Sequence, residues 1–263
     1  MDKELSLNEV KAIANATLKH FKAFCEANDI NFYLSNGTLL GAVKYGGFIP
    51  WDDDVDVLMP RKDYDKFVSI YKDSDKYKLF THELNPNYKF SYAKLCDMKT
   101  LKIETNIDSG VNLGIDIDIF PLDSCSAHIL SKSVQLKLAI YQRGCILSKF
   151  ISSKGKPLHK RFVISCCKLL GFEFFYKRMN KLVKQETALG DEYTGGLMWP
   201  IYGKKEIIPS EVFFDTIKVE FEGEKYPAPI GYDTYLHSLY GAYENDPPIE
   251  KQKTHHNFKA HKL

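Results

Sequence analysis

The chain has 263 residues, of which 44% are hydrophobic and 13% aromatic, and its formal net charge is +2. This length and apolar content support one large domain, or one domain with a sizeable insertion, and exclude a disordered chain. The balanced total charge gives no reason to expect a nucleic-acid partner, and no apolar run reaches the roughly 18 residues of a membrane span.

The charge is unevenly distributed along the chain. Residues 125–185 hold 13 Lys or Arg and one acidic residue, Glu173, whereas the remainder holds 23 basic and 33 acidic residues. We therefore predict an acidic core at 1–124, a basic insertion at 125–186, and a C-terminal part, 187–263, that returns to the core. Such a distribution suggests an anionic partner on one side.

The cysteines and the N-terminus bear on location. No pair of cysteines has C-x-x-C spacing and no cysteine has Cys/His ligand spacing, which argues against a zinc site and against a disulfide framework. The cysteines are Cys25, Cys96, Cys125, Cys145, Cys166 and Cys167. The first residues, MDKELSLNEV, do not resemble a signal peptide. We expect a cytoplasmic protein. Peripheral contact with the inner face of the plasma membrane is compatible with this location.

Taken in chain order, the first expected element is a helix. Ser6 and Glu9 form a capping-box pattern, and apolar residues then recur at helical spacing to about Glu26. A short strand at 32–34, a Gly-Thr turn at Gly37 and Thr38, and a segment able to form a helix should follow. A loop with paired glycines then leads to a cluster of carboxylates.

This cluster, Asp52, Asp53, Asp54 and Asp56, runs into an apolar strand at 55–59. Alternate side chains of a strand share a face, so Asp54 and Asp56 should point the same way. Two unpaired neighbouring carboxylates repel each other, but a divalent cation between them would remove the conflict, and oxygen ligands suit Mg²⁺ or Mn²⁺. Asp52 and Asp53 are either part of this site or a solvated acidic loop.

Two cations follow in sequence. Arg61, at the start of an expected helix, could reach the phosphate groups of a substrate or could be a surface arginine. Strands are expected at 78–81, 90–95 and 101–105. Lys94, a lone cation inside the second of these, could face the site or lie at a sheet edge.

A second pair of alternating carboxylates lies in the apolar segment 111–123. Asp116 and Asp118 should share one face of a buried strand, where each carboxylate needs a partner. Pairing of this strand beside 55–59 would bring a third carboxylate to the metal. Asp118 is our first choice as ligand or base, and Asp116 is a substitute. Asp123 could support the site from behind or cap the next helix.

The basic segment is predicted to be mostly helical, with a break at 155–157. Its cationic face is either simply solvated or docks on an anionic membrane surface or polyanionic acceptor. In the C-terminal part we expect extended segments at 197–200 and 213–220 and a helix that begins at 233 and ends near 240. The polar, aromatic-rich tail should cross the site, where His255 and His256 could contact phosphate or remain surface residues.

The stretch NGTLLGAVKYGGFIPWDDDVDV closely resembles the signature of the LicD family, within the nucleotidyltransferase-fold superfamily. IDIFPLD, at 117–123, and the aromatic C-terminal segment 226–256 resemble further motifs of that family. The likeness is good at 33–59 and 88–123 and weak in the basic segment. It implies an α+β fold: a mixed sheet with flanking helices and a helical basic insertion.

The resemblance also implies a function and roles for the residues above. LicD-type enzymes move a phospho-substituent, such as phosphocholine, from a CDP-activated donor to a glycan hydroxyl, and the acceptor here would be a glycan or lipid-linked glycan of lipopolysaccharide, teichoic acid or capsule. By this likeness Asp54, Asp56 and Asp118 are the metal-binding and catalytic residues. Those expected to bind substrate are Gly37, Thr38, Trp51, Arg61, Lys94, Asp116, Asp123, His255 and His256.

Three details stay open at this point. Tyr45, Trp51 and Tyr92 are candidates to enclose a choline ammonium group, by proximity to the motifs. The chain could instead transfer a nucleoside monophosphate from a nucleoside triphosphate. A third reading is a non-catalytic polyanion-binding scaffold, although such a protein has no physical need for three clustered carboxylates.

Overall fold

The computed structural model describes residues 4–104, 109–149, 155–200, 202–254 and 258–263. Within these residues the main sheet has eight strands, and its central path runs β1-β2-β5-β4-β10. The bounds on this path are β1 (Tyr33–Leu34), β2 (Asp56–Pro60), β5 (Leu113–Cys125), β4 (Ala93–Glu104) and β10 (Phe258–Lys262). β2 and β5 are parallel, whereas β4 is antiparallel to β5 and to β10. This mixed sheet with its flanking helices confirms the expected α+β class.

Three shorter strands extend the sheet. β3 (Tyr77–Phe80) pairs with β4, whereas β6 (Tyr193–Gly195) pairs with the end of β5 and with β7 (Ile208–Pro209). Two strands had been expected in the region that β4 occupies, but it is one strand with a register shift between Asp97 and Lys102. Gly114 faces this irregularity, because a Cβ there would lie 2.0 Å from the carbonyl oxygen of Asp97. Residues 197–199 form a turn rather than the extended segment expected there.

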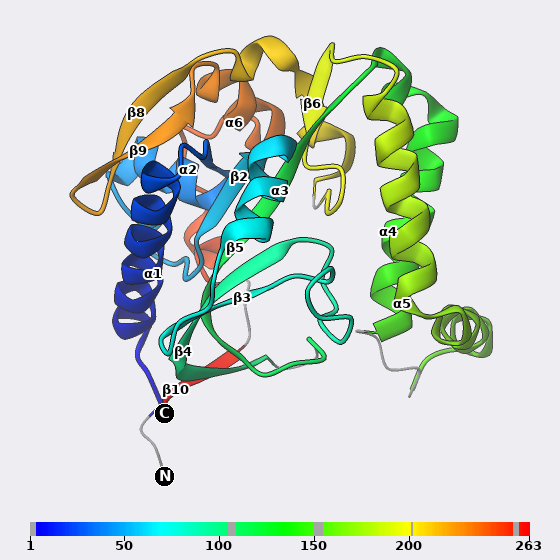
Figure 1. The fold of residues 1–263 in the computed structure, drawn as a ribbon, viewed down its shortest axis with the longest axis horizontal. Coiled ribbons are helices and arrows are strands. Elements are labelled where there is room, and N and C mark those ends of the chain that lie inside the picture. Colours follow the sequence, from blue (N-terminus) through cyan, green and yellow to red (C-terminus); the bar gives the residue numbers. More distant parts are fainter. Residues whose placement is uncertain (1–3, 105–108, 150–154, 201, 255–257) are drawn as a thin grey trace.

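Four helices pack around the sheet (Figure 1): α1 (Leu7–Ala27), α2 (Asn36–Tyr45), α3 (Arg61–Ile70) and α6 (Tyr232–Tyr240). The predicted capping box is present, since the Ser6 side chain accepts from the backbone of Glu9 and the Glu9 side chain accepts from the backbone of Ser6. The apolar stripe of α1 is buried in the main core. Gly37 and Thr38, expected in a turn, instead lie in the first turn of α2.

The basic segment forms a lobe beside the sheet (Figure 1). It consists of α4 (Lys132–Lys149) and α5 (Leu158–Thr187), which confirms that the segment is mostly helical. The lobe packs around a second cluster of buried apolar residues, separate from the main core, to which Leu197, Met198 and Ile207 of the C-terminal part also belong. Among the described residues, no helix is both long enough and apolar enough to span a bilayer.

A hairpin holds the glycine loop that follows α2. Its strands are β8 (Thr216–Phe221) and β9 (Glu224–Pro229). At its turn, the Glu222 carboxylate accepts from the backbone N–H of Phe48 at 3.1 Å, and the Glu222 N–H donates to the carbonyl of Gly46 at 2.9 Å. A Cβ on Gly47 would lie 2.3 Å from Glu222 Oε1, and one on Gly41 would lie 2.4 Å from the carbonyl oxygen of Gly47. Glycine is therefore required at Gly41, where the backbone of the loop folds back on α2, whereas at Gly47 the Glu222 side chain would have to move.

Candidate functional site

A pocket of about 690 Å³ opens at the N-terminal end of β2. Its walls come from the start of α2, the loop that leads into β2, and the C-terminal residues 240–247. Three carboxylates, Asp52, Asp54 and Asp56, share this pocket with an aromatic wall. The aromatic residues of the lining are Tyr45, Trp51, Tyr202, Tyr240 and Tyr243.

The parallel pairing of β2 with β5 sets the spacing of the acidic residues. Asp56 and Asp118 are direct partners in the register, and the Asp118 N–H donates to the carbonyl of Val55 at 2.8 Å. The prediction that the two carboxylate strands lie side by side is therefore confirmed. β2 begins at Asp56, so Asp54 lies in the extended loop before the strand rather than in it.

Asp56 is held in place by two residues of α2, one of which is in turn held by α6. Its backbone N–H donates to the Thr38 hydroxyl at 2.8 Å, so the buried Thr38 fixes the start of β2. Its side chain is hydrogen-bonded by Asn36, whose Oδ1 in turn accepts from the Tyr235 hydroxyl at 2.9 Å. Asn36 has φ of 46°, a left-handed conformation that asparagine tolerates better than most residues. Sequence reasoning missed Asn36 and Tyr235, although the asparagine directly precedes the Gly-Thr pair.

The carboxylates are crowded enough to disturb one another's ionisation. Burial, followed by the charges of Asp54, Asp118 and Asp52, raises the pKa of Asp56 well above its usual value. Burial also raises the pKa of Asp118 to about 7, even though Lys94 acts in the opposite direction. A group of hard oxygen donors that repel one another is a donor set suited to a divalent cation.

Asp52 and Asp53 belong to the same cluster. One carboxylate oxygen from each of Asp52, Asp53 and Asp54 lies within 4.8 Å of the others. Asp53 is buried and accepts from the Thr254 hydroxyl at 3.0 Å, which ties the C-terminal segment to the cluster. The reading of these two residues as a merely solvated loop is therefore disfavoured. The assignment of Asp54, Asp56 and Asp118 as metal ligands stays a prediction.

Lys94 neutralises the second pair of carboxylates. It is buried in β4, and its Nζ contacts both Asp116 and Asp118. Lys102 reaches Asp116 from the other side at 2.8 Å. Burial alone would raise the pKa of Asp116, but Lys102 and Lys94 outweigh it and hold that pKa well below its usual value. The sheet-edge reading of Lys94 is wrong, because at Lys94 the strand β4 lies between β5 and β3.

Arg61 and Asp123 lie at the opposite end of the same two strands. Arg61 follows the last residue of β2, and its Nε and Nη2 donate to the two carboxylate oxygens of Asp123 at 2.7 and 2.9 Å. Asp56 is at the first residue of β2. The structure therefore joins Arg61 and Asp123 to each other and does not bring either into the lining of the pocket.

Of the three aromatic residues predicted to enclose a choline group, two line the pocket and one does not. Trp51 and Tyr45 line the pocket with their rings in edge contact, at 6.4 Å between centroids. Tyr92 is buried against Phe120, at a centroid distance of 4.5 Å, so the structure does not place it with them. Tyr202 and Tyr240, which sequence reasoning missed, line the pocket with Tyr45 and Trp51. His255 and His256 lie outside the described residues.

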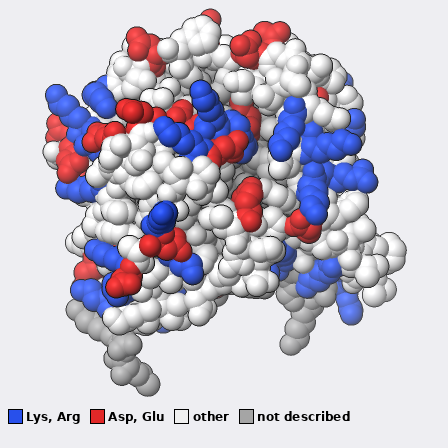
Figure 2. Space-filling model, in the orientation of Figure 1, with Lys and Arg blue, Asp and Glu red and all other residues white. Residues whose placement is uncertain are grey.

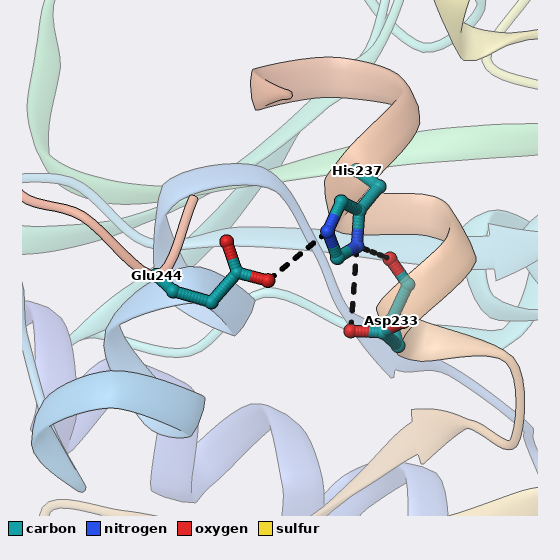
Figure 3. Close-up of side chains that lie close together, drawn as sticks. All are labelled: Asp233, His237 and Glu244. Carbon is teal, nitrogen blue, oxygen red and sulfur yellow. Dashed lines mark hydrogen bonds and ion pairs between the residues drawn. The ribbon is translucent and has the colours of Figure 1, made fainter. Parts of the chain in front are cut away.

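A histidine between two carboxylates lies beside the C-terminal wall (Figure 3). His237 of α6 lies between Asp233 and Glu244, with Nδ1 at 3.0 Å from the Asp233 carbonyl oxygen and Nε2 at 3.0 Å from Glu244 Oε1. The hydrogen bond to the Asp233 backbone, followed by the charges of Asp233 and Glu244, raises the pKa of His237. The carboxylates lie at opposite nitrogens of the ring, which is the arrangement of an ion-pair network rather than of ligands around one metal.

This arrangement predicts a pH-dependent contact. We expect NMR titration to give His237 a pKa above the usual value for histidine, and Glu244→Gln to lower it. Because the folded-state pKa is raised, the contact is present at low pH and is lost as the pH rises through that pKa. Glu250→Gln, on the exposed segment beyond the pocket, is the matched control and should leave the titration unchanged. An identical His237 pKa in the Glu244→Gln protein would contradict the assignment.

Comparisons with known proteins show what the sequence is similar to. A sequence profile of the family described as LicD/FKTN/FKRP, nucleotidyltransferase domain, matches residues 29–162. The chain is 30% identical to the lipopolysaccharide cholinephosphotransferase LicD of Haemophilus influenzae, with 99% of this chain and 100% of that protein covered. It is 33% identical to mannosyltransferase regulator 4 of Saccharomyces cerevisiae over 45% of this chain and 10% of that protein.

Proposed function

The chain belongs to the LicD/FKTN/FKRP nucleotidyltransferase-domain family, and from this premise we propose that it transfers phosphocholine from CDP-choline to a hydroxyl of a cell-surface glycan. The observation that carries the proposal is the position of Asp56, which lines the pocket together with the aromatic wall and is the register partner of Asp118 on β5. The likeness to a lipopolysaccharide cholinephosphotransferase extends over the full length of both chains, which supports the choice of phosphocholine.

The acidic cluster fits a divalent metal ion. Asp54, Asp56 and Asp118 are the residues we expect to hold Mg²⁺ or Mn²⁺, with Asp52 and Asp53 close by. The ion would neutralise charge on the donor's phosphate oxygens, which is the main requirement of phosphoryl transfer. Without such an ion, the anionic donor would meet only repulsion from this group of carboxylates.

The start of α2 offers a second means of holding phosphate. The first N–H groups of a helix have no acceptor within the helix, and the positive end of the helix dipole attracts anions. Gly37 lines the pocket within this first turn, and a Cβ there would lie 2.7 Å from Asp52 Oδ2. A glycine at this position leaves room for both the carboxylate and a phosphate. Thr38 contributes by fixing Asp56.

In the second role that we propose for Asp118, it does not ligate the ion but acts as the base. Its raised pKa of about 7 suits proton transfer near neutral pH. The acceptor oxygen would form a bond to the phosphorus that carries choline, while the bond from that phosphorus to the bridging oxygen breaks and CMP leaves. The proton of the acceptor hydroxyl would pass to Asp118, and Lys94 would hold the Asp118 side chain in position.

The aromatic wall suits the transferred group. A quaternary ammonium is attracted to the faces of aromatic rings. Tyr45 and Trp51 are in edge contact with each other, as are Tyr202 and Tyr240, and all four rings line the pocket with the carboxylates. We therefore propose these four residues for the choline group, which keeps Tyr45 and Trp51 from the predicted set and leaves out Tyr92.

The test is incubation of the purified protein with CDP-choline, Mg²⁺ or Mn²⁺, and a lipopolysaccharide- or teichoic-acid-type glycan. We expect CMP release and a phosphocholine-bearing glycan, both lost when EDTA removes the metal. Pyrophosphate release from a nucleoside triphosphate, with a nucleotidylated acceptor, would instead identify an NMP transferase. Binding of polyanions with no turnover of any CDP- or NTP-type donor would identify a non-catalytic scaffold.

A further inference from the structure

The first part of α5, residues 158–170, exposes most of its side chains, including large apolar ones. We call it the projecting helix; in Figure 1 it leaves the lobe at the lower right. Within this stretch, which the structure describes in full, Ile164 alone is buried and Cys167 is half-buried. The projecting helix therefore contributes almost nothing to the core of the lobe.

A backbone break separates this segment from the rest of α5. Gly171 has φ of 75° and ψ of 164°, which is not a helical conformation and which glycine adopts without strain. After Gly171 the helix packs on α4 and buries Phe172, Phe175, Tyr176 and Met179. The break thus allows the second part of α5 to pack while the first part turns away.

The exposed side of the projecting helix is apolar. Leu158, Phe162, Cys166 and Leu169 follow one another at spacings of four, four and three, so they share one helical face. Leu158 is 80% exposed, Phe162 71% and Leu169 89%. Val163 and Leu170 are also exposed and widen the stripe. The buried Ile164 lies on the opposite side, two residues or about 200° from Phe162.

Basic residues border this stripe. Arg161 and Lys168, seven residues apart, follow one edge, and Lys160 lies toward the other. No acidic residue occurs between Asp123 and Glu173. Figure 2 shows Lys and Arg gathered on the right over α4 and α5. A second copy of the chain on this face would bring two strongly cationic lobes together, which is unfavourable, whereas an anionic surface is attracted.

We propose that the projecting helix docks on an anionic lipid bilayer, with its apolar stripe inserted at the headgroup boundary and its cations on the lipid phosphates. A helix with an exposed apolar face, a basic polar face and a length too short to span is the kind that lies in the membrane interface. Long basic side chains can keep their charges at headgroup level while their stems cover apolar surface. The inference is independent of the chemistry proposed for the pocket.

The first test is co-sedimentation of the full chain with vesicles made of phosphatidylglycerol and phosphatidylcholine in equal parts. Phe162→Glu combined with Leu169→Glu should weaken binding by about tenfold or more, because two apolar groups no longer leave water. Lys160→Glu combined with Arg161→Glu should weaken binding comparably at low salt, and added salt should weaken the wild type. Phe214→Glu is the matched control: Phe214 is 80% exposed on the body, and its replacement should change nothing.

The second test asks whether the stripe enters the bilayer. Cys166 is the exposed cysteine on this face, and in a Cys167→Ser background it can be labelled with an environment-sensitive fluorophore. Emission should shift to the blue on addition of the anionic vesicles and not with phosphatidylcholine alone. Both tests use the folded full chain, whose circular dichroism should be the same for every variant.

Several outcomes would overturn the proposal. Vesicle binding that the Phe162→Glu/Leu169→Glu protein retains in full would show that the stripe does not insert. Concentration-dependent dimers that this variant dissociates, with no vesicle binding by the wild type, would show that a second copy covers the face. Binding of soluble polyanions such as heparin but not of vesicles would assign the cations to a different partner.

Discussion

Replacement of Asp56 by asparagine is expected to lower phosphocholine transfer by at least about a thousandfold, because stabilisation of phosphate charge by a bound metal amounts to several kcal/mol. The substitution keeps the shape of the side chain and removes its charge. Asp56 is buried at the start of β2, beside Asp118, and lines the pocket. CMP release under saturating CDP-choline and metal is the measurement.

The same variant should fold at least as stably as the wild type in the absence of metal. The pKa of Asp56 is raised by burial and by Asp54, Asp118 and Asp52, so its ionised form opposes folding at neutral pH. Urea unfolding in EDTA should give an equal or larger free energy of unfolding for Asp56→Asn. Asp75→Asn, at an exposed position, serves as the control for both assays. Turnover close to that of the wild type would remove Asp56 from the proposed metal site.

The second large effect concerns stability. Lys94→Met is expected to lower the free energy of unfolding by about 3–5 kcal/mol, the usual result of removing one partner from a buried ion pair. Lys94 is 3% exposed and contacts Asp116 and Asp118 at once. Methionine would fill a similar volume, but Asp118 would lose its ion-pair partner while Asp116 would keep Lys102.

A double variant and a control sharpen this prediction. Lys94→Met with Asp118→Asn should recover part of the lost stability, since the uncompensated charge is then gone. Lys78→Met, on the neighbouring strand β3, removes an exposed lysine and should change stability by less than about 0.5 kcal/mol. Urea denaturation followed by circular dichroism measures all three. A Lys94→Met protein as stable as the Lys78→Met control would show that the buried ion pairs contribute nothing.

The agreement between sequence and structure is best where a pattern is local. The capping box of Ser6 and Glu9, the helical nature of the basic segment and the alternation of Asp116 and Asp118 are confirmed. Pairing of the two carboxylate strands was also predicted correctly, because two buried acidic strands need a common partner. The metal itself, and the roles of the individual carboxylates, remain predictions.

Elements that depend on distant contacts were missed. Tyr202 and Tyr240 are more than 140 residues from the acidic motif in sequence, and only folding brings them to it. Tyr92 is next to a motif but is buried against Phe120. Gly171 breaks α5 although nothing in the apolar spacing marks it.

The sequence by itself determined the family resemblance, the mixed fold and the identity of the acidic cluster, since these follow from neighbouring residues and from the two-residue period of a strand. Only the tertiary structure decided which carboxylates each cation neutralises. Register placed Lys94 between Asp116 and Asp118, while the direction of β2 carried Arg61 to the far end and to Asp123. A buried charge is stabilised by an opposite charge that is close in space. Sequence separation does not show which residues will be close, since Lys94 and Asp116 are 22 residues apart and Arg61 and Asp123 are 62 residues apart.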